Sequence, residues 1–335
     1  MNLQKILWLA LVLTFFAGVQ AFTLEIWGTG SIGNIVNEVK DDLGDIDDKP
    51  EKFIRGFADA SVFSSSGATQ RAYGEYKLWA FTIGPMIGFR LPGSSPFNIT
   101  DEMQNVGDTL EEDGDAKLGV NIQAITGQIG INTSKFLLDR LYLGLRFGFF
   151  KLTGMEGFDL KTFQIGVVGN YQLLKGTTAG SGILRWRGVS AGTGFIFQKT
   201  DLTYNFTDET YTDGGFTTTP EVEFNMDIKT FVIPLEVNTS VQLLWVLNLN
   251  LGLGVDVAFG KNDTTIGADS PVYDPSGANV GTIYVRGGGD MAPTAFNPKI
   301  MTNIGFKFGP VILDVPVTYY FGNGFNAGIT LGAVW

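Results

Sequence analysis

The chain has 335 residues and contains neither cysteine nor histidine. These absences exclude a disulfide scaffold, zinc–histidine sites and histidine-dependent catalysis, whereas a carboxylate-based hydrolase remains possible. The formal net charge of −11 argues against nucleic acid as a partner, because nucleic-acid binding needs a basic surface.

The first 21 residues are typical of an export signal. Lys5 supplies a positive start, residues 6–19 are almost wholly apolar, and Val19–Ala21 resembles a small-residue cleavage site. The apolar run is shorter than the roughly 20 residues that a spanning helix needs. We therefore expect a signal peptide over residues 1–21 and a mature protein over residues 22–335.

Residues 22–72 allow two interpretations. Phe22 to Gly30 and Gly56 to Ser64 both carry apolar residues at alternate positions, which favours a further hairpin joined by an outer loop over 31–55. Alternatively, Ile32 to Leu43 forms an amphipathic helix, since its apolar residues recur at helical spacing. Such a helix would lie in an outer loop or plug the lumen of a barrel.

From Tyr73 onward the sequence predicts long amphipathic strands. In residues 245–260 the odd positions are large and apolar, whereas the even positions are mostly Asn, Gly, Asp and Ala. This alternation places one face of a strand toward lipid and the other toward a lumen. The same pattern recurs in further segments, over residues 79–90, 141–150, 163–172, 230–238, 303–308 and 311–321. Segments 116–132 and 183–199 change phase midway, as a β-bulge would cause.

The last eleven residues form one more alternating segment. Its large or apolar positions are Phe325, Ala327, Ile329, Leu331, Ala333 and Trp335. Counting back from this strand, the long connections are 92–115, 200–224 and 261–294. If the C-terminus is periplasmic, these three lie outside the cell, and the connections on the periplasmic side, 309–310, 242–244, 175–182 and 133–139, are short. Long outer loops over short inner turns are typical of outer-membrane barrels.

The export signal, the alternating strands and the closing strand ending in Trp335 together resemble bacterial outer-membrane β-barrel, porin-like proteins. The resemblance implies a place in the bacterial outer membrane and a closing strand that the barrel-assembly machinery reads. We predict an all-β fold, a transmembrane antiparallel up-and-down barrel of about 12 strands, or of 10 strands with an N-terminal plug or helix. Pro85, Pro234 and Pro316 each remove a ladder donor, so their strands are expected to kink or bulge.

Inward-facing charges are the candidate functional residues. They are Arg90, Arg146, Glu236, Asp256 and Asp314. Ionic side chains in a narrow pore select which solutes pass. The same residues would form an internal salt-bridge network if a small barrel were filled by side chains, as eight-stranded barrels are.

The predicted outer loops are acidic. Segments 92–115 and 200–224 contain many carboxylates and no Lys or Arg, which would attract cations to a pore mouth. They lack the spacing of a calcium-binding loop, so we expect solvated loops, with no metal site and no cofactor.

The leading functional hypothesis is an outer-membrane channel for passive passage of small solutes or small apolar compounds. The alternative is a surface-exposed adhesion or interaction protein that displays acidic loops on a non-conducting barrel. The expected partners are outer-membrane lipid, the barrel-assembly machinery during insertion, and small solutes. An enzyme is not expected.

Overall fold

The structure, a computed structural model, describes residues 20–30, 32, 35–37, 50–66, 78–91, 119–134, 137–155, 157–179, 183–207, 210–213, 215–322 and 324–334. Residues 1–19 of the expected signal peptide and the expected loop 92–115 lie outside the described residues.

One long helix and a single large sheet make up the described part of the chain. The elements are α3 (Pro50–Ser66), β1 (Gln20–Gly30), β2 (Trp79–Arg90), β3 (Gly119–Asn132), β4 (Leu141–Met155), β5 (Phe158–Ala179), β6 (Leu184–Thr207), β7 (Tyr211–Asp213), β8 (Phe216–Thr218), β9 (Glu221–Leu243), β10 (Leu247–Tyr273), β11 (Asn279–Met291), β12 (Phe296–Phe308), β13 (Val311–Tyr320), β14 (Gly324–Gly328) and β15 (Thr330–Val334). Among these residues, no helix is both long and apolar enough to cross a membrane.

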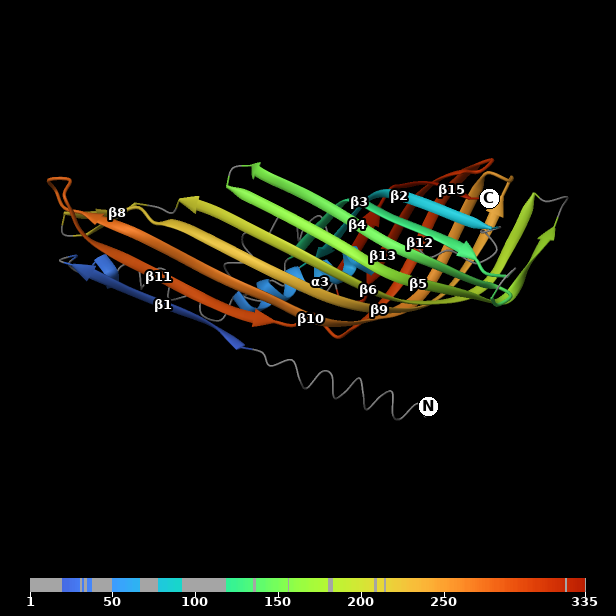
Figure 1. The fold of residues 1–335 in the computed structure, drawn as a ribbon, viewed down its shortest axis with the longest axis horizontal. Helices are drawn as coiled ribbons and strands as arrows, with labels where there is room; N and C mark the ends of the chain where they lie inside the picture. Colours follow the sequence, from blue (N-terminus) through green and yellow to red (C-terminus); the bar gives the residue numbers. More distant parts are fainter. Residues whose placement is uncertain are drawn as a thin grey trace, which may run out of the picture.

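The sheet closes into a barrel, as predicted (Figure 1). The strands β2, β3, β4, β5, β6, β9, β10, β12 and β13 pair in this order, each antiparallel to the next. β14 and β15 lie in line, and both pair with β13 on one side and β2 on the other. Within the described residues the ring therefore has ten strands, with β14 and β15 counted as one interrupted strand.

Ten strands with a helix match the alternative of the sequence analysis rather than its favoured twelve. The strand expected over residues 56–64 is wrong, because these residues lie within α3. Polar and apolar side chains of this stretch are both buried, so the alternation of its residue types does not distinguish an outer from an inner face. The helix expected over 32–43 is described only at Ile32 and in a short turn at 35–37.

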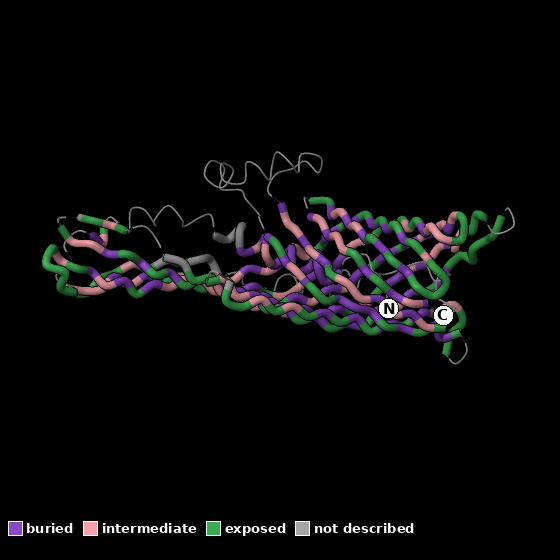
Figure 2. Tube along the Cα trace, turned by 90° about the horizontal axis from the view of Figure 1, so that it is seen from above, coloured by how far each residue is buried: buried purple, intermediate pink, exposed green. Residues whose placement is uncertain are grey.

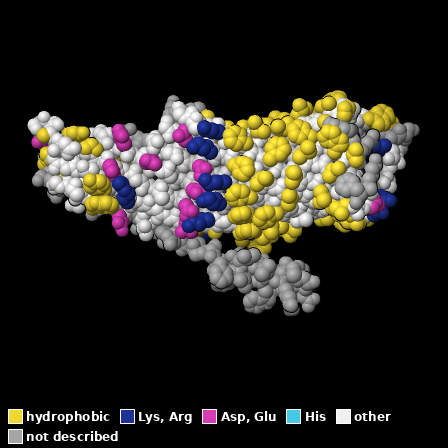
Figure 3. Space-filling model, in the orientation of Figure 1, with side chains coloured by type: hydrophobic (Ala, Val, Ile, Leu, Met, Phe, Trp, Pro, Cys, Tyr) yellow, Lys and Arg dark blue, Asp and Glu magenta, His cyan; other side chains and the backbone are white. Residues whose placement is uncertain are grey.

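Exposed and buried residues alternate along the barrel strands (Figure 2), as expected when side chains face the outside and the inside in turn. The outward side chains form a broad apolar band around the barrel (Figure 3). Leu253 is 59% exposed and Leu145 is 57% exposed, which would be unfavourable in water. From Leu247 to Phe259, β10 rises roughly 30 Å along the barrel axis at the usual strand rise and tilt, which matches the hydrocarbon thickness of a bilayer.

Beyond this band the sheet continues as an extension made of the ends of β6, β9 and β10 together with β11 and β1 (Figure 1). The expected loop over 261–294 is therefore wrong, because most of it is strand, and the expected loop over 200–224 is shortened by β6 and β9. These stretches are rich in Thr, Asn, Asp and Gly, so their composition resembles that of loops although their backbones pair.

A small apolar core lies on the inner face of the extension. Ile32 and Ile35 from the N-terminal segment pack against Val272 of β10 and Ile283 of β11. The apolar positions that were expected to form a helix face thus cover the sheet, as far as this segment is described.

The closing strand is interrupted at Ile329, between β14 and β15. Two prolines on the neighbouring strands flank this interruption. Pro85 lies at a register shift between β2 and β3. Pro316 lies where the partner of β13 changes from β15 to β14. Pro316 and Pro234 keep regular register with their neighbours Asn303 and Asp256. The expected irregularity is therefore confirmed at Pro85, where the ladder shifts.

The outward face of the closing strand is also confirmed. Ile329 and Leu331 are 54% and 55% exposed, and the intervening Thr330 is buried. Trp335 lies outside the described residues, and the role of this strand in assembly stays a prediction.

Candidate functional site

The lumen of the barrel contains α3, which approaches from the end that carries the extension (Figure 1). The first half of the helix is held by apolar contacts. Ile54 and Ala58 pack in a cluster with side chains from the surrounding strands, namely Leu160, Leu202, Met226, Ile228 and Met291. Asn262 also donates a hydrogen bond of 2.8 Å to the Ile54 carbonyl oxygen.

The second half of α3 combines apolar contacts with hydrogen bonds between buried polar side chains. Val62 and Phe63 pack in a cluster with side chains of the wall, and the Phe63 ring stacks on Tyr320 with centroids 4.0 Å apart. The Ser61 and Thr230 hydroxyl oxygens are 3.2 Å apart, and the Ser64 hydroxyl donates to Asn121 Oδ1 over 2.7 Å. Gln198 Nε2 lies within hydrogen-bond distance of Ser61 Oγ, at 2.9 Å, and of Asn121 Oδ1, at 3.0 Å. The polar side chains of this wall can bind water when the helix is absent.

Glycines in the barrel wall make room for the helix. A Cβ atom would come within 2.5 Å of α3 at three of them, Gly88, Gly119 and Gly324. At Gly88 the clash would be with the Ala60 carbonyl oxygen and the Ser64 amide nitrogen, which are backbone atoms and cannot rotate away. The helix backbone thus lies directly against the strands at Gly88 and Gly119, whereas Gly324 makes room for the Phe63 ring.

Four charged side chains meet at the inner end of the helix. Lys299 Nζ lies 2.5 Å from Glu236 Oε1 and 2.8 Å from Asp256 Oδ1, and it donates a hydrogen bond of 2.9 Å to Ser66 Oγ of α3. Arg146 is buried within electrostatic range of the same two carboxylates. Two cations and two anions make the group formally neutral, which is how it tolerates burial.

The structure brings together three of the five predicted site residues, Arg146, Glu236 and Asp256. Arg90 is separate from them, and its Nε lies 3.8 Å from Asp59 Oδ2 of α3. Asp314 is also separate and accepts a hydrogen bond of 3.0 Å from Asn303. The selectivity role assigned to these residues stays a prediction.

Sequence reasoning missed Lys299 and Asp59. Lys299 lies on β12, and extending the alternation of 303–308 back by four residues would have placed it in the lumen. Asp59 could not be found in this way, because residues 56–64 were expected to form a strand.

Amides line the lumen between the charged group and the barrel end that carries the short turns. They include the buried side chains of Gln128, Asn170, Asn238, Asn248 and Asn303. Farther toward that end, Tyr142, Ala80, Ile312 and Val334 form an apolar cluster. The described lumen is thus apolar at both ends, and its middle carries polar and charged side chains beside a second apolar cluster that includes Val232 and Tyr320.

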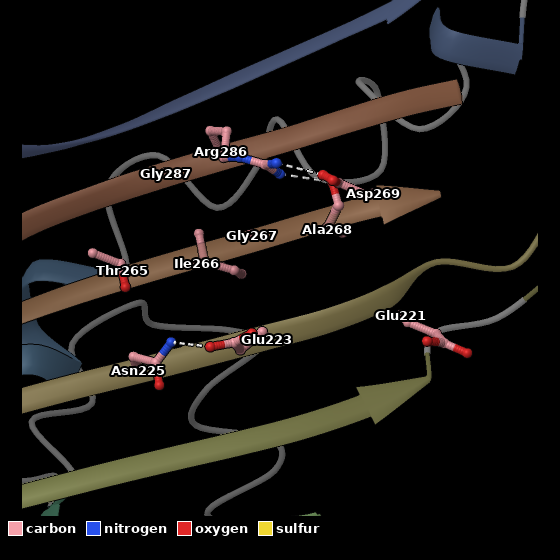
Figure 4. A pocket seen from close by; sticks show the side chains of 10 residues that line it. All are labelled: Glu221, Glu223, Asn225, Thr265, Ile266, Gly267, Ala268, Asp269, Arg286 and Gly287. Atoms are coloured by element: carbon pink, nitrogen blue, oxygen red, sulfur yellow. Dashed lines mark hydrogen bonds and ion pairs between the residues drawn. The ribbon is translucent and has the colours of Figure 1, made fainter. Parts of the chain in front are cut away.

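A separate groove lies on the outer face of the extension (Figure 4). It has a volume of about 570 Å³ and is lined by side chains of β9, β10 and β11. Glu223 accepts a hydrogen bond of 2.6 Å from Asn225, and Arg286 forms an ion pair with Asp269. Among the described residues, no group of three or more carboxylates is placed to hold a metal ion.

Aromatic side chains lie beside this groove. Trp27 of β1 stacks on Tyr284 of β11 with ring centroids 5.6 Å apart, and the Arg286 guanidinium lies 5.9 Å from the Tyr284 ring. Trp27 is 41% exposed, so this cluster presents an aromatic surface to solvent.

Comparison with solved structures finds β-rich proteins of low similarity. The toluene transporter TbuX of Ralstonia pickettii is 10% identical, with 84% of this chain and 99% of that chain covered, at a TM-score of 0.27. The translocator domain of the autotransporter NalP from Neisseria meningitidis is 8% identical, with 77% and 89% covered, at a TM-score of 0.30. LpxR from Salmonella typhimurium is 8% identical, with 76% and 100% covered, at a TM-score of 0.25. None of these similarities is close enough to support an argument about function.

In sequence, no curated protein matches the chain. A family model described as Lsa36-like matches residues 29–335, which include all of the barrel, α3 and the extension apart from most of β1. The chain belongs to the Lsa36-like family.

Proposed function

We propose that this protein is an outer-membrane channel for small polar solutes whose lumen is closed by α3. The observation that carries the proposal is the polar contact between the second half of α3 and the wall. Because these side chains can exchange their hydrogen bonds for bonds to water, movement of the helix would not leave them buried without partners.

The exposed apolar band supports the placement in a membrane (Figure 3). The short connections 133–140, 180–183, 244–246 and 309–310 lie at one end, together with the C-terminal strand β15. The extension lies at the other end (Figure 1). This arrangement supports a periplasmic C-terminus and an extension on the outside of the cell.

The lining of the lumen indicates the class of solute. The wall beside and below α3 carries Gln, Asn, Thr and charged side chains, which favour polar solutes over apolar compounds. The charged group around Lys299 is formally neutral, so it favours neither cations nor anions strongly.

A disulfide lock tests the movement of α3. The chain has no cysteine, so cysteines placed at Ser61 and Thr230, whose side-chain oxygens are 3.2 Å apart, would be the only pair available. In a planar bilayer, the reduced Ser61→Cys/Thr230→Cys protein should open in discrete steps, and oxidation should silence it. The Ser61→Cys single variant should not respond to oxidant. Equal conductance before and after locking, or silence in both states, would refute the proposal.

A second candidate is a surface interaction protein, favoured by the cluster of Trp27, Tyr284 and Arg286 beside the groove. Trp, Tyr and Arg are the residues that most often dominate binding energy at interfaces. If the extension binds a partner, Trp27→Ala and Arg286→Ala should weaken capture of the full chain from a panel of immobilised proteins and glycans. Unchanged capture by both variants would exclude this cluster as the binding surface.

A further inference from the structure

Outward lysines form a belt at the edge of the apolar band, on the side of the extension. Five lysines from the adjacent strands β4, β5, β6, β9 and β10 make up this lysine belt: Lys151, Lys161, Lys199, Lys229 and Lys261. In Figure 3, basic and acidic side chains gather in a narrow column beside the hydrophobic surface.

The belt has a fixed height relative to the band. Lys199, Lys229 and Lys261 lie directly opposite one another on neighbouring strands. A parallel row of aromatic residues lies two positions nearer the band on the same strands, at Phe197, Phe231 and Phe259. The Phe231 and Phe259 rings are stacked, with their centroids 5.3 Å apart. Two residues of a tilted strand rise about 5 Å, so the ammonium groups lie in the headgroup layer when the aromatic row lies at the hydrocarbon boundary.

A row of aspartates lies two residues farther out, at Asp201, Asp227 and Asp263. Ion pairs join the two rows, with distances of 2.8 Å from Lys199 Nζ to Asp201 and 2.6 Å from Lys229 Nζ to Asp227. The lysine side chains remain between 37% and 52% exposed, and each ammonium has three N–H donors, so donors remain for a ligand.

The arrangement of the rows is unfavourable for strand pairing alone. Like charges directly opposite one another on antiparallel strands destabilise a sheet, and here three lysines and three aspartates are each aligned in this way. Ion pairs between the two rows, including one across the strands from Lys199 Nζ to Asp227 at 3.9 Å, offset part of this repulsion. Aligned lysines are favourable when an external row of anions lies beside them.

We propose that the lysine belt binds the phosphate groups of anionic lipids in the leaflet on the side of the extension. The proposal rests on the membrane placement in the proposed function but does not depend on conduction. Phosphates of lipid headgroups lie at this height all around a barrel, and an ammonium is a common ligand for phosphate.

Lipid retention by the full refolded chain in detergent micelles tests this proposal. The probe is diphosphorylated lipid A, measured by native mass spectrometry against the same lipid without its phosphates. Lys199→Gln/Lys229→Gln/Lys261→Gln should reduce affinity for the phosphorylated lipid at least about tenfold and leave the dephosphorylated lipid unchanged. Arg140→Gln/Lys175→Gln/Arg185→Gln, at the opposite end of the barrel, should change affinity less than about twofold.

The variant Lys199→Arg/Lys229→Arg/Lys261→Arg should retain the lipid, because arginine also binds phosphate. Retention by this variant would show that the Gln variant loses the lipid through its missing charges and not through misfolding. Excess inorganic phosphate should not displace the lipid if the membrane lipid is the ligand. Equal losses in the belt and control variants, or equal binding of the two lipids, would overturn the proposal. A barrel that retains lipid but never conducts would refute the channel and leave the belt intact.

Discussion

Lys299 Nζ lies 2.8 Å from Asp256 Oδ1, and both side chains are fully buried in the lumen. Lys299 on β12 is directly opposite Gly254 of β10, two residues from Asp256 on the same strand. Together with Glu236 and Arg146, this pair makes a neutral group in the middle of the barrel, next to the end of α3.

Removing one charge from this group should destabilise the barrel strongly. Lys299→Met leaves two buried carboxylates with one cation, and the free energy of unfolding should fall by about 3–5 kcal/mol. Urea unfolding in lipid vesicles, followed by tryptophan fluorescence, measures the change. Lys299→Met/Glu236→Leu keeps the group neutral and should recover most of the loss. A double variant less stable than Lys299→Met would contradict this account.

Adding one methyl group at the helix contact should displace α3. Gly88→Ala would place a Cβ 2.5 Å from backbone atoms of the helix, and we expect a loss of about 1–3 kcal/mol in the free energy of unfolding. Hydrogen exchange at the amides of α3 should also become faster. Gly169→Ala is the matched control, because its Cβ would have an ordinary contact at 3.5 Å. If the two variants exchange alike, the close approach at Gly88 does not hold the helix.

A charge on the apolar band should be tolerated far less than a charge on the extension. Leu253→Arg places a cation near the middle of the band and should cost about 2–4 kcal/mol of stability in a bilayer. Thr265→Arg introduces the same residue on the exposed face of the same strand, beyond the lysine belt, and should have little effect. Unfolding in vesicles compares the two. Equal effects would place the membrane boundary elsewhere.

The mouth of the lumen offers a fourth test, at Asp59 of α3. This carboxylate accepts hydrogen bonds from the Thr294 amide at 2.6 Å and the Thr294 hydroxyl at 2.9 Å, and it lies near Arg90. Asp59→Asn weakens these bonds and should lower the free energy of unfolding by about 1.5–3 kcal/mol. Thr294→Ala keeps the amide bond and should cost less.

Conductance distinguishes the two roles that Asp59 could have. If it holds the helix in place, Asp59→Asn should also open the channel more often in a planar bilayer. A variant that is less stable but opens no more often would show that this contact stabilises the barrel without controlling it.

The barrel itself could be predicted from the sequence because its outward and inward positions differ sharply in hydrophobicity. In β10 every second residue from Leu247 to Phe259 is large and apolar, and the turns follow where this alternation stops. Three of the predicted lumen charges meet for the same reason, since the period of a strand sets the face of every side chain. The extension was not predicted, because its strands contact water on one face and carry Thr, Asp and Gly, which are also typical of loops.

The sequence by itself therefore determined the alternating strands, their order and the outward face of the closing strand, because these depend on local periodicity. Only the tertiary structure decided that residues 50–66 form a helix inside the lumen and that Lys299 joins Glu236 and Asp256. The same holds for the lysines of neighbouring strands, which align at the edge of the band. These features depend on strand register and on what fills a ten-stranded barrel, and both are set by contacts between residues far apart in the chain.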